Sequence, residues 1–109
     1  MTGICYMVTA TLPSEAVAEE YVAWLRDGHV AQVIAGGART GMIVRLDVEA
    51  GGLARVMTQY VFASRTAFDQ YVRQHAPALR AEGLRRCGAE TGGRLGGAVG
   101  EVGWGGGVE

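Results

Sequence analysis

The strongest constraint on the fold is the period-two alternation of residues 4–12, which predicts a β-strand. Apolar side chains fill the even positions of this segment: Ile4, Tyr6, Val8, Ala10 and Leu12. The odd positions also begin with apolar residues, Cys5 and Met7. A strand that is apolar on both sides is expected in a sheet that is covered on both faces. Pro13 ends the strand, and Ser14 is a favourable N-cap for a following helix.

Two helices are predicted from the spacing of apolar residues. The first covers residues 15–28, and residues 29–35 are expected to add a short helical turn. Its apolar positions are Val17, Tyr21, Trp24 and Leu25. Ser64 caps the second helix, which continues to about Gly83 with a break or bend at Pro77. The second helix repeats Phe68, Tyr71, Val72 and His75 on one side.

Three further strands are predicted over residues 40–48, 55–63 and 94–104, with a hairpin loop at Gly51 and Gly52. The last of these strands is rich in glycine. Because glycine offers no side chain for cross-strand pairing, we expect this strand to be the least regular one. The element order is βαββαβ, which predicts an α+β, ferredoxin-like fold: an antiparallel sheet with both helices on one face.

The face of the sheet away from the helices is predicted to be apolar, with Cys5, Met7, Ile43, Met57 and Val61 on it. A large exposed apolar patch is unusual in a monomer. We therefore expect a second copy of the chain to cover this face in a homodimer. Arg45 and Gln59 are predicted to project onto the same face. They would either form hydrogen bonds across the dimer or line a wet ligand pocket.

The length and the net charge of the chain limit the functional classes to which it can belong. The 109 residues leave room for one domain, expected over residues 1–104, followed by a flexible glycine-rich tail over 105–109. A formal net charge of −1 gives no basic surface for nucleic acid or for an anionic membrane. No apolar run approaches the roughly 20 residues of a membrane span. No signal peptide is predicted, so we expect a cytoplasmic protein.

Several kinds of chemistry are excluded by residue type. The chain has no lysine, which removes Schiff-base chemistry and the P-loop lysine. The two histidines and two distant cysteines have no zinc-site spacing, and no metal site is predicted. Cys5 and Cys87 are interpreted as reduced structural thiols.

His29 is the candidate catalytic residue, because an imidazole is a proton acceptor near neutral pH. The alternative is a histidine held at a helix C-terminus, where the helix dipole favours its charged form. His75 is expected in core or interface packing. Trp24 and Tyr60 are candidate ligand contacts whose spacing also suits the core. The local cluster of Arg80, Arg85 and Arg86 is interpreted as a solvated face.

Three segments form a recognisable pattern. The first is Trp24-Leu25-x-x-Gly28-His29-Val30-x-x-Val33-x-x-Gly36, the second is Gln59-Tyr60, and the third is Ala76-Pro77-x-Leu79-Arg80-x-x-Gly83-Leu84-x-Arg86. Over residues 4–87 this pattern resembles a bacterial family of unknown function in the dimeric α+β barrel superfamily. The resemblance implies a dimer whose sheets face each other, with pockets between sheet and helices. Members of the superfamily include cofactor-free quinol monooxygenases, haem-degrading enzymes and stress-response proteins.

Two functional hypotheses stay open, and whether the protein is an enzyme is undecided between them. The first is a small-ligand-binding or cofactor-free monooxygenase-like protein, whose pocket near the sheet involves His29, Arg45, Gln59, Tyr60 and Trp24. This first hypothesis predicts no cofactor, with haem kept as an alternative ligand. The alternative is a non-catalytic homodimeric module with a regulatory or interaction role.

Overall fold

The fold comes from a computed structural model that describes residues 3–48, 52–87 and 93–103, with residues 83–87 described by their backbone alone. The hairpin glycine Gly51, the side chain of Cys87 and the tail 105–109 therefore lie outside the described residues.

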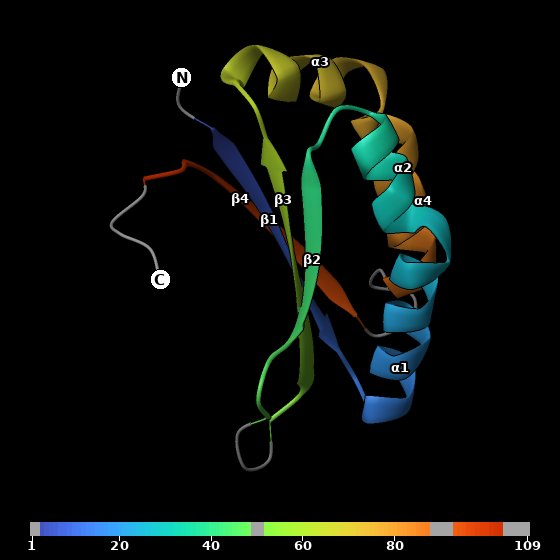
Figure 1. Cartoon of the computed structure of the whole chain (residues 1–109). Helices are drawn as coiled ribbons and strands as arrows, with labels where there is room; N and C mark the ends of the chain where they lie inside the picture. Colours follow the sequence, from blue (N-terminus) through green and yellow to red (C-terminus); the bar gives the residue numbers. More distant parts are fainter. Residues whose placement is uncertain (1–2, 49–51, 88–92, 104–109) are drawn as a thin grey trace.

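Four antiparallel strands form one sheet in the order β2-β3-β1-β4, as Figure 1 shows. The strands are β1 (Ile4–Leu12), β2 (Thr40–Arg45), β3 (Ala54–Phe62) and β4 (Arg94–Glu101). This strand order, with the chain order βαββαβ, is that of the ferredoxin-like α+β fold. The predicted fold class is confirmed.

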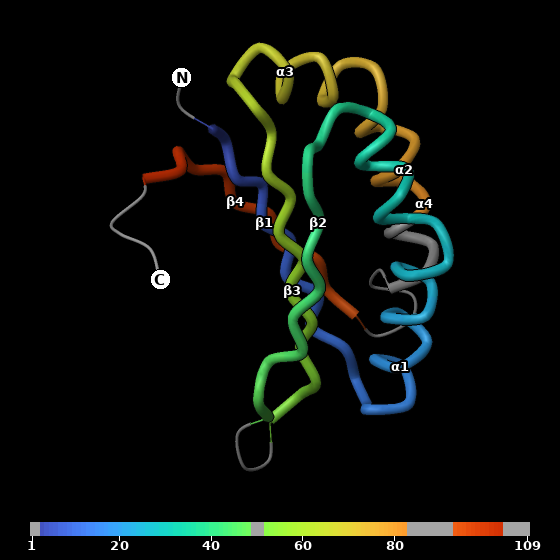
Figure 2. The backbone as a smooth tube through the Cα atoms, in the orientation of Figure 1, coloured from blue at the N-terminus to red at the C-terminus, as the bar shows by residue number. Residues whose placement is uncertain are grey.

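All the helices of the described residues lie on one side of the sheet (Figures 1 and 2). They are α1 (Glu15–Trp24), a π-helical turn η1 (Leu25–His29), α2 (Val30–Ala35), α3 (Arg65–Gln74) and α4 (Ala76–Cys87). The short helical turn predicted after Gly28 is present as α2. None of the described helices lies on the opposite side of the sheet, which we call the open face.

Serine caps fix where the helices of both halves begin. The backbone N–H of Val17 donates to Ser14 Oγ at 3.2 Å, and that of Ala67 donates to Ser64 Oγ at 3.2 Å. Each serine satisfies one of the backbone donors that a helix leaves unpaired at its start. Both predicted caps are confirmed.

The second predicted helix is broken into α3 and α4 at His75, whose φ of −125° is not helical. Pro77 stands in the first turn of α4, where its missing N–H has no helical partner to lose. The prediction that this helix stops near Gly83 is wrong, because the backbone of α4 continues to Cys87. A glycine inside a helix costs only about 1 kcal/mol relative to alanine, which neighbouring turns can offset.

The predicted orientation of β2 is also wrong. Pairing with β3 sets Met42 opposite Gln59 and Val44 opposite Met57. Met42 and Val44 are therefore on the open face, whereas Ile43 and Arg45 project toward the helices. A period-two pattern fixes which residues share a face, but only the pairing register decides which face that is. The open face stays apolar all the same.

The prediction that β4 is the least regular strand is wrong as well. Every residue from Arg94 to Glu101 pairs with β1, without a bulge, from Thr11 to Ile4. The ladder is built from backbone N–H and C=O groups, so glycines can continue it where a partner strand is fully formed. β4 is an edge strand that β1 holds in register.

The core lies between the sheet and the helices. Leu12, Val56, Tyr60 and Phe62 are fully buried on the helix-facing side of β1 and β3, and Leu25 and Val33 meet them from the helix layer. Gly41 of β2 is required for this packing, because a Cβ there would lie 2.7 Å from Val30 Cγ1 and 3.2 Å from the Tyr60 ring. The helix layer thus sits directly on the sheet at this point.

Candidate functional site

A small cavity of about 60 Å³ lies between the sheet and the helices, and we call it the inner cavity. Its walls are largely aromatic: Tyr6, Tyr21, Tyr60, Tyr71 and Trp24, joined by His29. The sheet and the helix layer both contribute to it. Tyr6 and Tyr60 are cross-strand partners on β1 and β3, and their ring centroids are 6.2 Å apart.

The Tyr60 hydroxyl is buried without a hydrogen-bond partner among the described residues. Only 2% of the residue is exposed. Burial raises the pKa of Tyr60 to about 12, and Tyr6 reinforces this effect. The Thr58 hydroxyl is near enough to oppose it in part, but Thr58 Oγ1 donates its hydrogen bond to the Val8 carbonyl oxygen at 3.5 Å and not to Tyr60. The phenol is therefore neutral at physiological pH. It offers a hydrogen bond that no described protein group accepts, and such a group is costly to bury.

His29 brings a second buried polar atom to the same cavity. Its Nδ1 is buried without a hydrogen-bond partner among the described groups. The ring stacks on Trp24, with centroids 4.1 Å apart and an interplanar angle of 25°. Burial lowers the pKa of His29, and the negative charge of Glu82 raises it by a smaller amount. At neutral pH the imidazole is accordingly uncharged and able to accept a proton.

The π-helical turn η1 sets the position of His29. Gly28 within that turn has φ of 147°, a conformation that favours glycine. The chain then continues into α2, so His29 lies between two helical segments and not at a free helix end. Burial lowers the pKa of His29 and so favours the neutral imidazole over the charged form that a helix C-terminus would stabilise. The non-helical backbone at Gly28 is a kink between the two helical segments.

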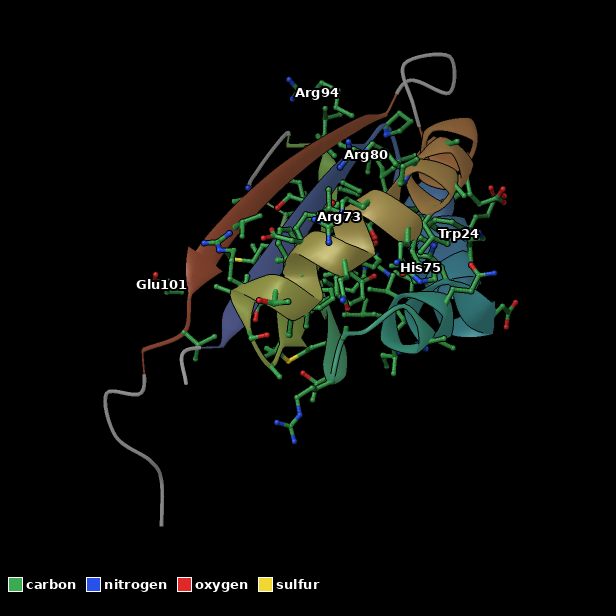
Figure 3. All side chains as sticks on the ribbon, turned by 90° about the horizontal axis from the view of Figure 1, so that it is seen from above. Trp24, Arg73, His75, Arg80, Arg94 and Glu101 are labelled. Carbon is green, nitrogen blue, oxygen red and sulfur yellow. The ribbon has the colours of Figure 1, made fainter. Side chains whose placement is uncertain are left out.

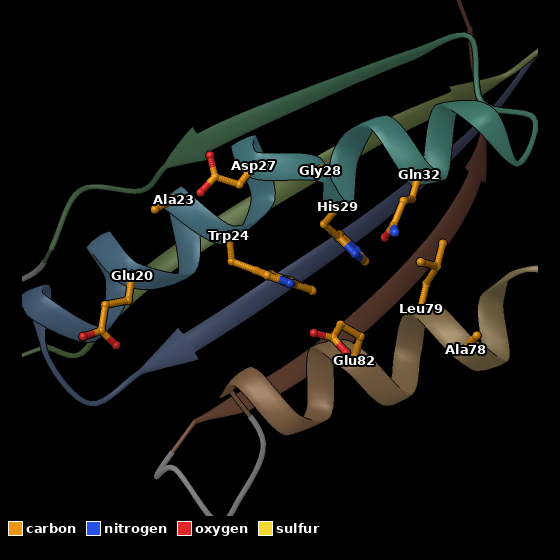
Figure 4. Close-up of a pocket in the computed structure, with 10 residues that line it drawn as sticks. All are labelled: Glu20, Ala23, Trp24, Asp27, Gly28, His29, Gln32, Ala78, Leu79 and Glu82. Atoms are coloured by element: carbon orange, nitrogen blue, oxygen red, sulfur yellow. The ribbon is translucent and has the colours of Figure 1, made fainter.

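A wider cleft of about 750 Å³ lies on the outer side of Trp24 and His29, between the α1–η1–α2 rod and α4 (Figure 4). We call it the outer cleft. It shares Trp24, His29 and Leu79 with the inner cavity. Its other charged lining residues are all acids: Glu20, Asp27 and Glu82. The Trp24–His29 stack therefore forms a wall between a wide acidic cleft and a small aromatic cavity.

The structure brings together three of the five predicted site residues. Trp24, His29 and Tyr60 all line the inner cavity. Arg45 does not, because it pairs with Glu15 of α1. Gln59 lies on the open face, where its Nε2 is 3.5 Å from Met57 Sδ.

The remaining predictions fall outside the cavity. His75 is exposed, although its ring lies parallel to that of Tyr71 at 6.4 Å, so it packs on the surface of the core and not within it. Cys5 is a free thiol, half-buried on the open face.

Sequence reasoning missed other contributors to the inner cavity, among them Tyr6 and Arg80. Tyr6 shares a face and a cross-strand pair with Tyr60, so correct pairing of β1 with β3 would have found it. Arg80 is exposed, as the interpretation of a solvated face predicted, and it also borders the cavity. Its position depends on how α4 packs on the sheet, which the local pattern does not encode.

In the described part of the chain, no group of three or more histidine, cysteine, aspartate or glutamate residues is placed to hold a metal ion. None of the described helices is long and apolar enough to cross a membrane.

Residues 3–91 match the model of a protein family described as Domain of unknown function (DUF4286). The chain belongs to this family. The resemblance noted over residues 4–87, to a family without an assigned activity, is thereby confirmed. No curated protein matches the sequence of this DUF4286 member.

Solved structures share the fold of this DUF4286 chain at low sequence identity. A dimeric ferredoxin-like protein from an uncultured marine organism aligns with a TM-score of 0.74 and 14% identity, over 94% of this chain and 96% of its own. A protein of the ethyl tert-butyl ether d (EthD) family from Bacillus halodurans aligns with a TM-score of 0.71 and 14% identity, over 94% of this chain and 99% of its own. SnoaB from Streptomyces nogalater, a cofactor-independent oxygenase studied as the N63A mutant, aligns with a TM-score of 0.62 and 15% identity, over 89% of each chain. At these identities the likeness shows the fold alone.

Proposed function

We propose that this protein is a homodimer that binds a small aromatic molecule at the inner cavity and oxidises it as a cofactor-free monooxygenase. One observation carries the proposal: His29 Nδ1 and Tyr60 Oη are both buried, both without a protein partner among the described groups, and both at one cavity. Buried polar atoms are normally hydrogen-bonded. A ligand with oxygen atoms would supply the missing partners.

The sizes of the two spaces suggest how the ligand is held. The inner cavity of about 60 Å³ has room for a ring substituent or for about two water molecules. The outer cleft of about 750 Å³ falls within the usual range for small-molecule sites. A planar ligand would lie against the rings of Trp24 and His29 and reach Tyr60 with one substituent. Rearrangement of the Trp24–His29 wall would join the two spaces.

The chemistry needs few protein groups. Neutral His29 would accept a proton from an acidic ring CH₂ or hydroxyl group, and Tyr60 would donate a hydrogen bond to the oxygen that gains electron density. The electron-rich anion then reacts with O₂: the CH₂ carbon becomes a carbonyl, and the second oxygen atom leaves as water. All electrons come from the substrate. The similarity in fold to SnoaB, described as a cofactor-independent oxygenase, supports this proposal.

Homodimer formation is proposed from the open face. Met7, Val44, Met57 and Val61 share this face by strand register, together with Met42, which is 52% exposed. The described helices all lie on the other side of the sheet (Figure 1). A second sheet packed on this face would bury its apolar centre, as is typical of homodimer interfaces. Similar folds described as dimeric ferredoxin-like proteins support the proposal.

The direct test is oxygen uptake with anthrone, a tricyclic ketone with an acidic ring CH₂ group. We expect uptake above the uncatalysed rate, and formation of the corresponding quinone. His29→Asn should lower the rate by about 10²-fold, the low end of the usual contribution of a general base. His75→Asn is the matched control and should leave the rate unchanged. Equal rates for wild type and His29→Asn would contradict the catalytic role.

The alternative function is a non-catalytic homodimeric module, and the small volume of the inner cavity favours it. In that case two trapped waters would satisfy His29 and Tyr60, and no aromatic compound would bind. Thermal unfolding with and without anthrone separates the two functions. A rise in melting temperature that Tyr60→Phe reduces supports ligand binding, whereas no rise with any aromatic probe supports the module.

A further inference from the structure

We propose that the aromatic ligand carries an anionic group, such as a carboxylate, which is bound by Arg80. This anionic group would lie between α4 and β4, at the end of the inner cavity that faces away from the outer cleft. This inference takes the aromatic character of the ligand from the proposed function. It adds the charge of the ligand and the direction in which the ligand lies in the cavity.

A second opening adjoins the inner cavity on the β4 side. It has a volume of about 280 Å³ and lies between α3, α4 and β4, and we call it the β4 groove. Tyr6, Tyr71, Ala76 and Arg80 line both the β4 groove and the inner cavity. Phe68, Val72 and Val99 complete an apolar surface. Figure 3 labels Arg80 where helix α4 passes beside strand β4.

Gly97 keeps the β4 groove open on its strand side. It lies on the helix-facing side of β4, opposite Val8, and a Cβ there would be 3.6 Å from the Tyr6 ring. A larger side chain would therefore stand in the groove against that ring. The glycine-rich sequence of β4, which adds little to the core, thus leaves space where the groove passes along the strand.

Arg80 supplies positive charge at the junction of the two spaces. Arg80 is exposed, and the ion pair found among the described residues, Arg45–Glu15, does not involve it. Its charge acts on the cavity, since it lowers the pKa of Tyr71 against the larger effect of burial. A guanidinium binds a carboxylate through two parallel hydrogen bonds and also stacks on aromatic rings. Both properties suit an aromatic acid.

The two sides of the inner cavity differ in charge. On the outer cleft the charged lining residues are Glu20, Asp27 and Glu82, with His29 held neutral. On the β4 groove the charged lining residue is Arg80. An anion is repelled from the first and attracted to the second. The ligand therefore has its anionic end at Arg80 and its neutral ring toward Tyr60 and His29.

The test compares two probes of the same shape, 2-naphthoate and the neutral 2-naphthamide, by titration calorimetry. We expect the wild type to bind 2-naphthoate about three- to fivefold more tightly than 2-naphthamide, because the exposed guanidinium of Arg80 pairs with the carboxylate but not with the amide. Arg80→Gln should abolish this difference by weakening only the acid. Arg73→Gln, an equal change of charge on exposed α3 outside the β4 groove, should leave both affinities unchanged.

The outcomes separate this inference from the function on which it rests. If the two probes bind equally, or if Arg80→Gln and Arg73→Gln act alike, the anionic ligand is contradicted while aromatic binding stands. If neither probe binds, both proposals are contradicted. Competition by 10 mM inorganic phosphate tests for a bare anion site: displacement of 2-naphthoate by phosphate would overturn the aromatic-acid class. Circular dichroism checks that Arg80→Gln retains its fold.

Discussion

The His29 imidazole lies against the Trp24 indole, with ring centroids 4.1 Å apart and planes inclined by 25°. The two rings come from opposite ends of the η1 turn and form one wall of the inner cavity. This stack shields part of the half-buried histidine from water, and desolvation disfavours its charged form. The positioning of His29 and its neutral state therefore have the same structural cause.

Stability should fall on mild acidification because of His29. Its pKa is lowered from 6.5 in the folded state, so below about pH 6.5 the unfolded chain binds a proton that the folded chain resists. The free energy of unfolding then decreases as the pH falls from about 7 through 6.5. Urea unfolding at pH 7.5 and pH 5.5 measures this decrease. The decrease in the free energy of unfolding should be smaller in His29→Asn than in the wild type, and should be the same in His75→Asn as in the wild type. An equal decrease in all three proteins would contradict the assignment of this effect to His29.

Removing the Tyr60 hydroxyl should not destabilise the free protein. The hydroxyl is buried without an acceptor among the described groups, so Tyr60→Phe removes an unsatisfied group and retains the ring. We expect the free energy of unfolding to stay the same or to rise by up to about 1 kcal/mol. Tyr60→Ala, which removes the ring, should cost about 3–5 kcal/mol. A large loss in Tyr60→Phe would mean that the hydroxyl has a structural partner.

Close packing at Gly41 predicts a strong effect from one methyl group. A Cβ at this position would lie 2.7 Å from Val30 Cγ1, so Gly41→Ala forces β2 and α2 apart. We expect a loss of about 1–3 kcal/mol in chemical denaturation. Gly96→Ala on β4 is the control, because no atom lies within 4 Å of a Cβ there. Equal stabilities of the two variants would contradict the packing of α2 on the sheet.

The sequence predicted what local patterns encode. Ser14 and Ser64 cap their helices as expected, and β1 has the predicted bounds, because capping and alternation depend on neighbouring residues. The orientation of Arg45 could not be predicted, because it depends on the register between β2 and β3. Arg80 is exposed as predicted, but its place beside the inner cavity could not be predicted, because it depends on the packing of α4 beside β4, far away in the sequence.

The candidate site, too, was predicted only where local sequence is informative. Trp24, His29 and Tyr60 were found because aromatic and titratable residues at helix and strand positions stand out in the sequence. The η1 turn, which orients His29, had one visible signal in Gly28. Glycine at that point predicted the end of a helix, and the backbone does leave the helical region at Gly28 before α2 begins. The sequence did not indicate that this kink would place the His29 ring against Trp24.

A charge at the centre of the open face should prevent dimer formation. Met57 lies on β3 next to Val44 of β2 and Thr9 of β1, so Met57→Glu places a carboxylate in the middle of the proposed interface. We expect Met57→Glu to be monomeric or unfolded, because an unpaired buried charge is strongly disfavoured. Glu19→Ala, on the exposed side of α1, should leave the assembly unchanged. A Met57→Glu protein that assembles like the wild type would place the interface elsewhere.

Sedimentation equilibrium of the wild type at micromolar concentration tests most directly whether the sheet is covered by helices on one face and by a second copy on the other. The monomer has a mass of 11.5 kDa. The predicted result is a single species of twice that mass, with an interface expected to bury more than about 1,000 Å². A folded species that sediments as the monomer across this concentration range would contradict the dimer.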